Sequence, residues 1–148
     1  MYIFRVPVYK VSTKSPIGVF LLVLYKSTKQ KDFMRKIERK MNTALLSKKN
    51  WASSNTTVTY NEFTNCSSVL LHGHNIATLD HNTKALKLSS CGYETNTTKS
   101  RLNAILEETF YGCKVFQKNW NWFVSKYNKT VDFVDGMIIL NTSDLEVA

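Results

Sequence analysis

Apolar and polar residues alternate with two different periods along the chain, and each period predicts one kind of element. Between residues 29 and 47, apolar side chains recur every three or four positions, which is typical of a helix with one buried face. Residues 97–109 show the same spacing, and Thr97 or Thr98 is expected to cap this second helix. The sequence therefore predicts two amphipathic helices.

The segments on either side of the second helix have the two-residue period of strands. In residues 85–89, Leu86 and Leu88 fall on one face and Lys87 on the other. The dipeptide at residues 135–136, Asp-Gly, is the strongest hairpin signal. The pattern predicts antiparallel meanders, and hence an α+β fold with a mainly antiparallel sheet covered by helices on one face. The predicted strands are residues 56–60, 67–72, 76–79, 85–89, 113–117, 120–125, 131–134 and 137–140.

The first 28 residues are expected to form a separate hairpin or arm. Two β-branched and aromatic segments, residues 3–11 and 17–25, flank the turn signal Ser15-Pro16. The second segment has about half of the roughly 20 apolar residues that a membrane-spanning helix needs, so we expect a buried strand and no membrane association. Residues 29–148 are then expected to form a single α+β domain.

The formal net charge of +9 is concentrated near the N-terminus. Residues 1–50 contain twelve lysines and arginines and two acids, whereas residues 51–148 contain eight basic residues and nine acids. Most cations of the first predicted helix lie outside its apolar stripe, which suits contact with phosphate. The same face could also be an ordinary solvated surface opposite the core, or a surface that lies on a membrane. The candidate phosphate-binding residues of this segment are Lys31, Arg35, Lys36, Arg39 and Lys40.

Two further cations, Lys99 and Arg101, fall at the start of the second predicted helix. Cations are mildly unfavourable at that end of the helix dipole, whereas anions are favoured there, so the pair is a candidate phosphate clamp. Farther along, Trp120 and Trp122 would share one face of a strand, with Lys118 in the preceding turn. Rings beside lysines are typical of single-stranded nucleic-acid sites. The alternative is that the tryptophans belong to the core.

Cysteines and histidines do not form a recognisable metal motif. The three cysteines are expected to be free thiols, because their number is odd and their spacing fits no disulfide framework. Two of the cysteines and all three histidines are residue types that bind zinc. Their spacings match no zinc-finger pattern, however, so we predict no metal and no cofactor. The candidate zinc ligands that we considered are Cys66, His72, His74, His81 and Cys91.

Catalytic motifs are also lacking in the sequence. It contains no paired carboxylates, no G-x-S-x-G motif and no phosphate-binding glycine loop. His72 or His74 could act as a base beside the cations of the second helix, but nothing else supports a hydrolase. The sequence therefore predicts a protein that is not an enzyme.

Several segments of the chain resemble a family of small tailed-phage proteins. The resemblance covers residues 41–140 and depends on V-x-L-H-G-x-x-I-A at 69–77, T-x-T-T-K-S-R-L-N-A-I-L at 95–106, V-F-Q-K-x-x-x-W-F at 115–123 and F-x-D-G-M at 133–137. The segment at 51–57 completes it. The resemblance implies a viral source and the cytoplasm of an infected bacterial host. It implies no activity, cofactor or partner.

These observations favour a non-enzymatic phage accessory protein that binds DNA or RNA through its basic N-terminal helix. The alternative is a protein-interaction module, either a virion component or an inhibitor of a host protein. The two differ in salt dependence, because phosphate contacts weaken steeply with salt and an interface of aromatic anchors does not.

Overall fold

The computed structural model describes residues 34–140 of the 148 residues. The chain divides into two units, Met1–Arg35 and Lys36–Ala148, and the fold described here is that of the second unit. The expected N-terminal arm and the expected boundary after residue 28 lie outside the described residues. Lys31 and the first residues of the predicted basic helix lie outside them as well.

Two helices form where the apolar periodicity predicts them. Helix α2 spans Lys36–Leu46 and begins later than predicted, since the two residues before it are not helical. It ends at Leu46, and Lys48, two residues farther on, has a φ of 58° in the left-handed region. Helix α3 spans Asn96–Thr109.

The residue that caps α3 differs from the prediction. Thr95 is the N-cap, and its hydroxyl oxygen accepts a hydrogen bond from the Thr98 backbone N–H at 3.1 Å. Thr98 lies inside the helix and is buried, so the predicted cap at Thr97 or Thr98 is wrong by two or three residues. The reason is local, because only the residue before the first turn can accept from the N–H groups that the helix leaves unpaired.

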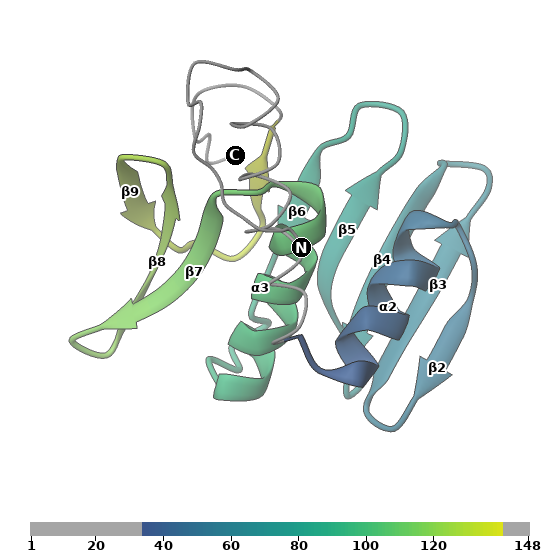
Figure 1. Cartoon of the computed structure of the whole chain (residues 1–148), viewed down its shortest axis with the longest axis horizontal. Coiled ribbons are helices and arrows are strands. Elements are labelled where there is room, and N and C mark those ends of the chain that lie inside the picture. Colours follow the sequence, from purple (N-terminus) through teal and green to yellow (C-terminus); the bar gives the residue numbers. More distant parts are fainter. Residues whose placement is uncertain (1–33, 141–148) are drawn as a thin grey trace, which may run out of the picture. The chain divides into compact units, whose positions relative to one another are not determined.

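An antiparallel sheet of six strands forms most of the fold, in the order β10-β6-β5-β4-β3-β2 (Figure 1). Strands β2 to β6 follow one another as a meander, as the sequence predicts. The side chains that point to one face are buried, whereas the opposite face is partly exposed. The strands are β2 (Trp51–Ser53), β3 (Thr56–Asn61), β4 (Cys66–Leu71), β5 (His74–Asp80), β6 (Leu86–Leu88) and β10 (Met137–Ile139).

Both helices pack on the apolar face of this sheet, α2 over β3 and β4 and α3 against β5 (Figure 1). The stripe of α2 that faces these strands includes Met41 and Leu45, and both are fully buried, as are Val58 of β3 and Val69 of β4. The α+β class, with a mainly antiparallel sheet and helices on one face, is therefore confirmed.

A second sheet of three strands was not predicted as a separate unit. It comprises β7 (Cys113–Lys118), β8 (Asn121–Lys126) and β9 (Lys129–Asp132), in that order. The Asn103 side chain attaches it to α3: its amide nitrogen donates to the Val115 carbonyl at 2.9 Å, and its amide oxygen accepts from the Val115 N–H at 2.7 Å. Helix α3 thus contacts both sheets.

The hairpin predicted around Asp135 and Gly136 is wrong. Strand β9 pairs with β8, whereas β10 crosses to the large sheet, where Met137 pairs with Leu88. The Asp135 carboxylate accepts hydrogen bonds from the backbone N–H and the hydroxyl of Ser90, at 2.6 and 2.9 Å. These long-range bonds hold the Asp-Gly segment as a connection between the two sheets.

Candidate nucleic-acid interface

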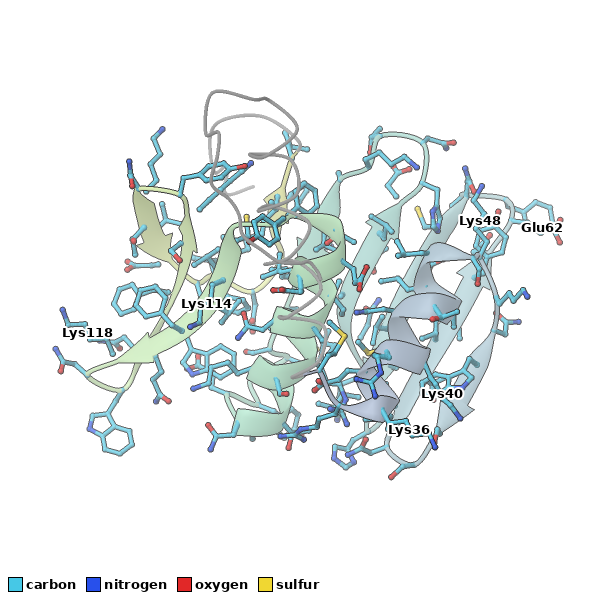
Figure 2. All side chains as sticks on the ribbon, in the orientation of Figure 1. Lys36, Lys40, Lys48, Glu62, Lys114 and Lys118 are labelled. Atoms are coloured by element: carbon cyan, nitrogen blue, oxygen red, sulfur yellow. The ribbon has the colours of Figure 1, made fainter. Side chains whose placement is uncertain are left out.

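All the charged residues on the exposed face of α2 are basic. Lys36, Arg39 and Lys40 are exposed and lie three or four residues apart, so they share one side of the helix. Lys48 and Lys49 follow the helix and are exposed too. Figure 2 shows Lys36 and Lys40 on the ribbon of α2 and Lys48 beyond its C-terminal end. We call these five residues the basic face of α2.

This face lacks an acid because the one acidic residue of α2 points inward. Glu38 is buried, and its carboxylate oxygen lies 2.9 Å from Nη1 of Arg101. The same oxygen accepts a hydrogen bond from the Ser100 hydroxyl at 2.6 Å. Arg101 also donates from Nε to the Thr56 hydroxyl at 3.1 Å. The pair therefore links α2, α3 and β3. Because Glu38 is buried in it, all exposed charged residues of α2 are cations.

Arg101 must be removed from the set of candidate phosphate ligands. Only 3% of its surface is exposed, and its guanidinium is used in the ion pair with Glu38. The sequence could not show this, because the two residues are 63 positions apart. Arg35, the remaining cation of the predicted helix, is exposed but precedes α2.

Lys99 is directed toward the small sheet and does not act with Arg101 as a clamp. Its ammonium nitrogen donates to the Gln117 side-chain oxygen at 3.4 Å. It also lies 5.8 Å from the centre of the Trp122 ring, within the range of a cation–π contact. Lys99 is half-buried in this position.

The two candidate tryptophans occupy opposite environments. The turn between β7 and β8 consists of Asn119 and Trp120, so Trp120 is in the turn and is 88% exposed. Trp122 is on β8, is only 4% exposed, and packs edge-on against Phe133 with ring centres 5.5 Å apart. The expected shared face is therefore wrong, and Trp122 belongs to the core. The turn begins one residue later than predicted.

The β7–β8 hairpin brings two predicted site residues, Lys118 and Trp120, together with three that the sequence analysis missed, Lys114, Phe116 and Phe123. Phe116 and Phe123 are directly opposite in the ladder, both half-exposed, with their rings stacked at 5.6 Å and an angle of 26°. Lys114 and Lys118, two residues to each side of Phe116, are on the same face and exposed (Figure 2). We call these four residues and Trp120 the hairpin platform. Correct strand pairing was the signal needed to find it.

The histidines and cysteines do not converge. Among residues 34–140, no group of three or more His, Cys, Asp or Glu side chains is placed to hold a metal ion. His81 is buried and bonded to the Ser67 hydroxyl at 2.8 Å, and the Cys91 thiol donates to the Asn75 carbonyl at 3.0 Å. His74 instead lies against the Tyr93 ring, with ring centres 4.8 Å apart.

Next to these rings is a pocket of about 410 Å³, lined by His72, His74, Tyr93 and threonines at the start of α3. It is open and of mixed polarity, with hydroxyls, imidazoles and apolar side chains at its walls. No pair of carboxylates is among its lining residues. The two histidines thus lie in this pocket near the N-terminus of α3.

Burial shifts the pKa values of several groups in the described part of the chain, among them His81 and Cys113. It lowers the pKa of His81 below its usual 6.5, and the nearby charges of Lys48 and Lys84 lower it further, with Asp80 acting in the opposite direction. Burial also raises the pKa of the Cys113 thiol, against the opposing effect of Lys126. Neither group belongs to the basic face of α2 or to the hairpin platform.

The fold and its surfaces define a small α+β protein with a basic helix face and an aromatic hairpin. A protein-family model described as Kyanoviridae Gp96 protein matches residues 34–140. The chain therefore belongs to this family of phage proteins and is made in an infected host cell. Neither the curated proteins nor the solved structures include a significant match. Within the described residues, neither helix is long and apolar enough to cross a membrane.

Proposed function

We propose that this phage protein binds nucleic acid in the cytoplasm of the infected host, without catalysing a reaction, and that the basic face of α2 contacts phosphate. The observation that carries the proposal is the inward orientation of Glu38, because of which every exposed charged residue of α2 is a cation. A surface of this kind attracts the phosphate backbone without reading its sequence.

The spacing of the cations supports this function. Lys36 and Lys40 are one turn apart on α2, so their Cα atoms are separated by about 6 Å along the axis. Lys48 and Lys49 extend the positive charge past the helix C-terminus, where cations are also favoured by the dipole. Several cations along one line can therefore contact successive phosphates of one strand.

A protein-interaction module is the second candidate, because five large rings of the described residues are exposed, three of them by more than two thirds of their surface. Phe63 is 95% exposed, Trp120 88% and Tyr127 72%. These rings lie in three different turns, however, between β3 and β4, β7 and β8, and β8 and β9. Interfaces usually concentrate their aromatic anchors near one centre, so this arrangement supports a protein partner less well than the basic face supports phosphate.

The proposal is tested with the full chain by fluorescence anisotropy of a labelled DNA duplex at several salt concentrations. The variant Lys36→Gln/Lys40→Gln is expected to weaken binding on the order of tenfold, because two phosphate contacts are lost. The control Lys87→Gln/Lys129→Gln removes the same charge from exposed residues of β6 and β9 and is expected to leave affinity nearly unchanged. Equal losses in both variants would show that only net charge matters, and would refute a site on α2.

A further inference from the structure

The outer face of the β7–β8 hairpin carries two stacked, half-exposed phenyl rings. In the ladder, Phe116 pairs with Phe123, Lys114 with Ser125, and Lys118 with Asn121. These residues share one face because strand side chains alternate. The opposite face of the hairpin carries Val115, Trp122 and Val124, which are buried. The phenyl pair therefore contributes little to the core, although each ring is large.

The turn of this hairpin holds its largest side chain in a costly conformation. Asn119 and Trp120 have φ values of 50° and 67°, the combination of a two-residue turn that normally takes Asn-Gly. A bulky residue with positive φ is an outlier, since its Cβ crowds the following carbonyl. An indole that is 88% exposed gains little from burial to offset this cost. Such strain is often retained at functional sites.

Charge on this face is divided between the two edges of the small sheet. Lys114 and Lys118 are on the edge strand β7, about 13 Å apart along the strand. On the other edge strand, Asp132 pairs with Phe123 and is exposed. A phosphate backbone would therefore follow β7, next to the lysines, and its bases would extend over the phenyl rings.

We propose that the hairpin platform binds single-stranded nucleic acid, stacking unpaired bases on Phe116, Phe123 and Trp120 while Lys114 and Lys118 contact phosphate. Stacked rings beside cations are the recognition elements of single-strand binding surfaces. A duplex keeps its bases stacked inside, so it offers the platform only its backbone. This inference uses the proposed ligand class but concerns a surface separate from α2.

The experiment measures binding of the full chain to labelled oligo(dT), oligo(rU) and a DNA duplex of equal length, by fluorescence anisotropy. Trp120→Gly removes the indole and places in the turn the residue that it favours, so the fold is retained. Phe116→Leu/Phe123→Leu keeps the apolar contact and removes both rings. Phe63→Ser is the control, because it removes a 95% exposed ring from the β3–β4 turn, next to Glu62.

The platform variants are expected to weaken single-strand binding at least about fivefold for each lost stacking contact, with either sugar, and to change duplex binding less than twofold. The Phe63→Ser control is expected to bind like the wild type. The proposal is overturned if folded Trp120→Gly and Phe116→Leu/Phe123→Leu variants bind the single strands as tightly as the wild type. If those variants bind normally while Lys36→Gln/Lys40→Gln does not, the basic face of α2 stands and the platform fails. If the wild type binds no oligonucleotide, both proposals fail.

Discussion

The buried ion pair between Glu38 and Arg101 affects the surface charge of α2, because it removes the one acidic residue of the helix from the surface. Their ion pair is buried, with 4% of each side chain exposed. The Ser100 hydroxyl also donates to Glu38, and Arg101 also donates to the Thr56 hydroxyl. A buried charge without its partner is strongly unfavourable, whereas replacing both partners by apolar residues is often neutral. The pair therefore sets the orientation of α2 more than it adds net stability.

Arg101→Met is expected to lower the free energy of unfolding by about 3–5 kcal/mol, because it leaves the Glu38 carboxylate buried without its guanidinium. Urea denaturation at neutral pH measures this loss. The double variant Glu38→Leu/Arg101→Met is expected to recover most of it. If the double variant is as unstable as the single one, the geometry of the pair, and not uncompensated charge, would be its main contribution.

His81 gives the fold a pH dependence of predictable sign. Its pKa is lowered in the folded state, first by burial and then by Lys48 and Lys84, so the unfolded chain binds more protons just below pH 6.5. The stabilisation is therefore complete above the unfolded pKa and is lost as the pH falls toward the folded pKa.

The melting temperature of the wild type is expected to fall between pH 7.5 and 5.5, and that of His81→Gln is expected to fall less. Glutamine can still bond to Ser67 but takes up no proton in this range. Thermal denaturation followed by circular dichroism provides the measurement. Parallel pH profiles for the two proteins would assign the pH dependence to other groups.

At the scale of single elements, the N-terminus of α3 depends on one threonine. Thr95→Ala removes the hydroxyl that accepts from the Thr98 N–H and is expected to cost about 1 kcal/mol in urea denaturation. Thr97→Ala, two residues farther on, is the matched control and is expected to cost much less. A larger loss from Thr97→Ala would contradict the assigned cap.

Periodicity in the sequence was sufficient to predict most elements but not their partners. The strand at Leu86–Leu88 and helix α3 match the prediction closely, because the apolar residues of each recur with the period of that element and are buried on one face. The Asp-Gly turn misled the prediction, because the Asp135 carboxylate bonds to Ser90, 45 residues away. Trp120 lies in the turn and not on the strand, because the turn begins one residue later than predicted. Local patterns do not contain such long-range contacts.

For the candidate sites too, the sequence predicted what depends on local spacing and missed what depends on long-range contacts. Lys36, Arg39 and Lys40 are exposed on α2 as their spacing predicts, since they lie off the apolar stripe. Arg101 could not be distinguished from them, because its partner Glu38 is far away in the sequence. The Phe116–Phe123 pair becomes visible only when the register of β7 and β8 is known.

For the whole molecule, the two proposed surfaces belong to different parts of one folded unit. The basic face is on α2, which packs on the large sheet, and the hairpin platform is on the small sheet, which α3 contacts. Both surfaces expose cations, and the platform also exposes the rings of Phe116, Phe123 and Trp120. The account thus expects backbone contact on α2 for any nucleic acid and base stacking on the hairpin for single strands.

The central claim, phosphate contact by the basic face of α2, is tested most directly by the slope of log affinity against log salt for a DNA duplex. For Lys36→Gln/Lys40→Gln, the slope is expected to be shallower than that of the wild type by about 1.8, or about 0.9 for each lost contact. For the control Lys87→Gln/Lys129→Gln, the slope is expected to equal that of the wild type. Identical slopes for all three proteins would contradict the claim.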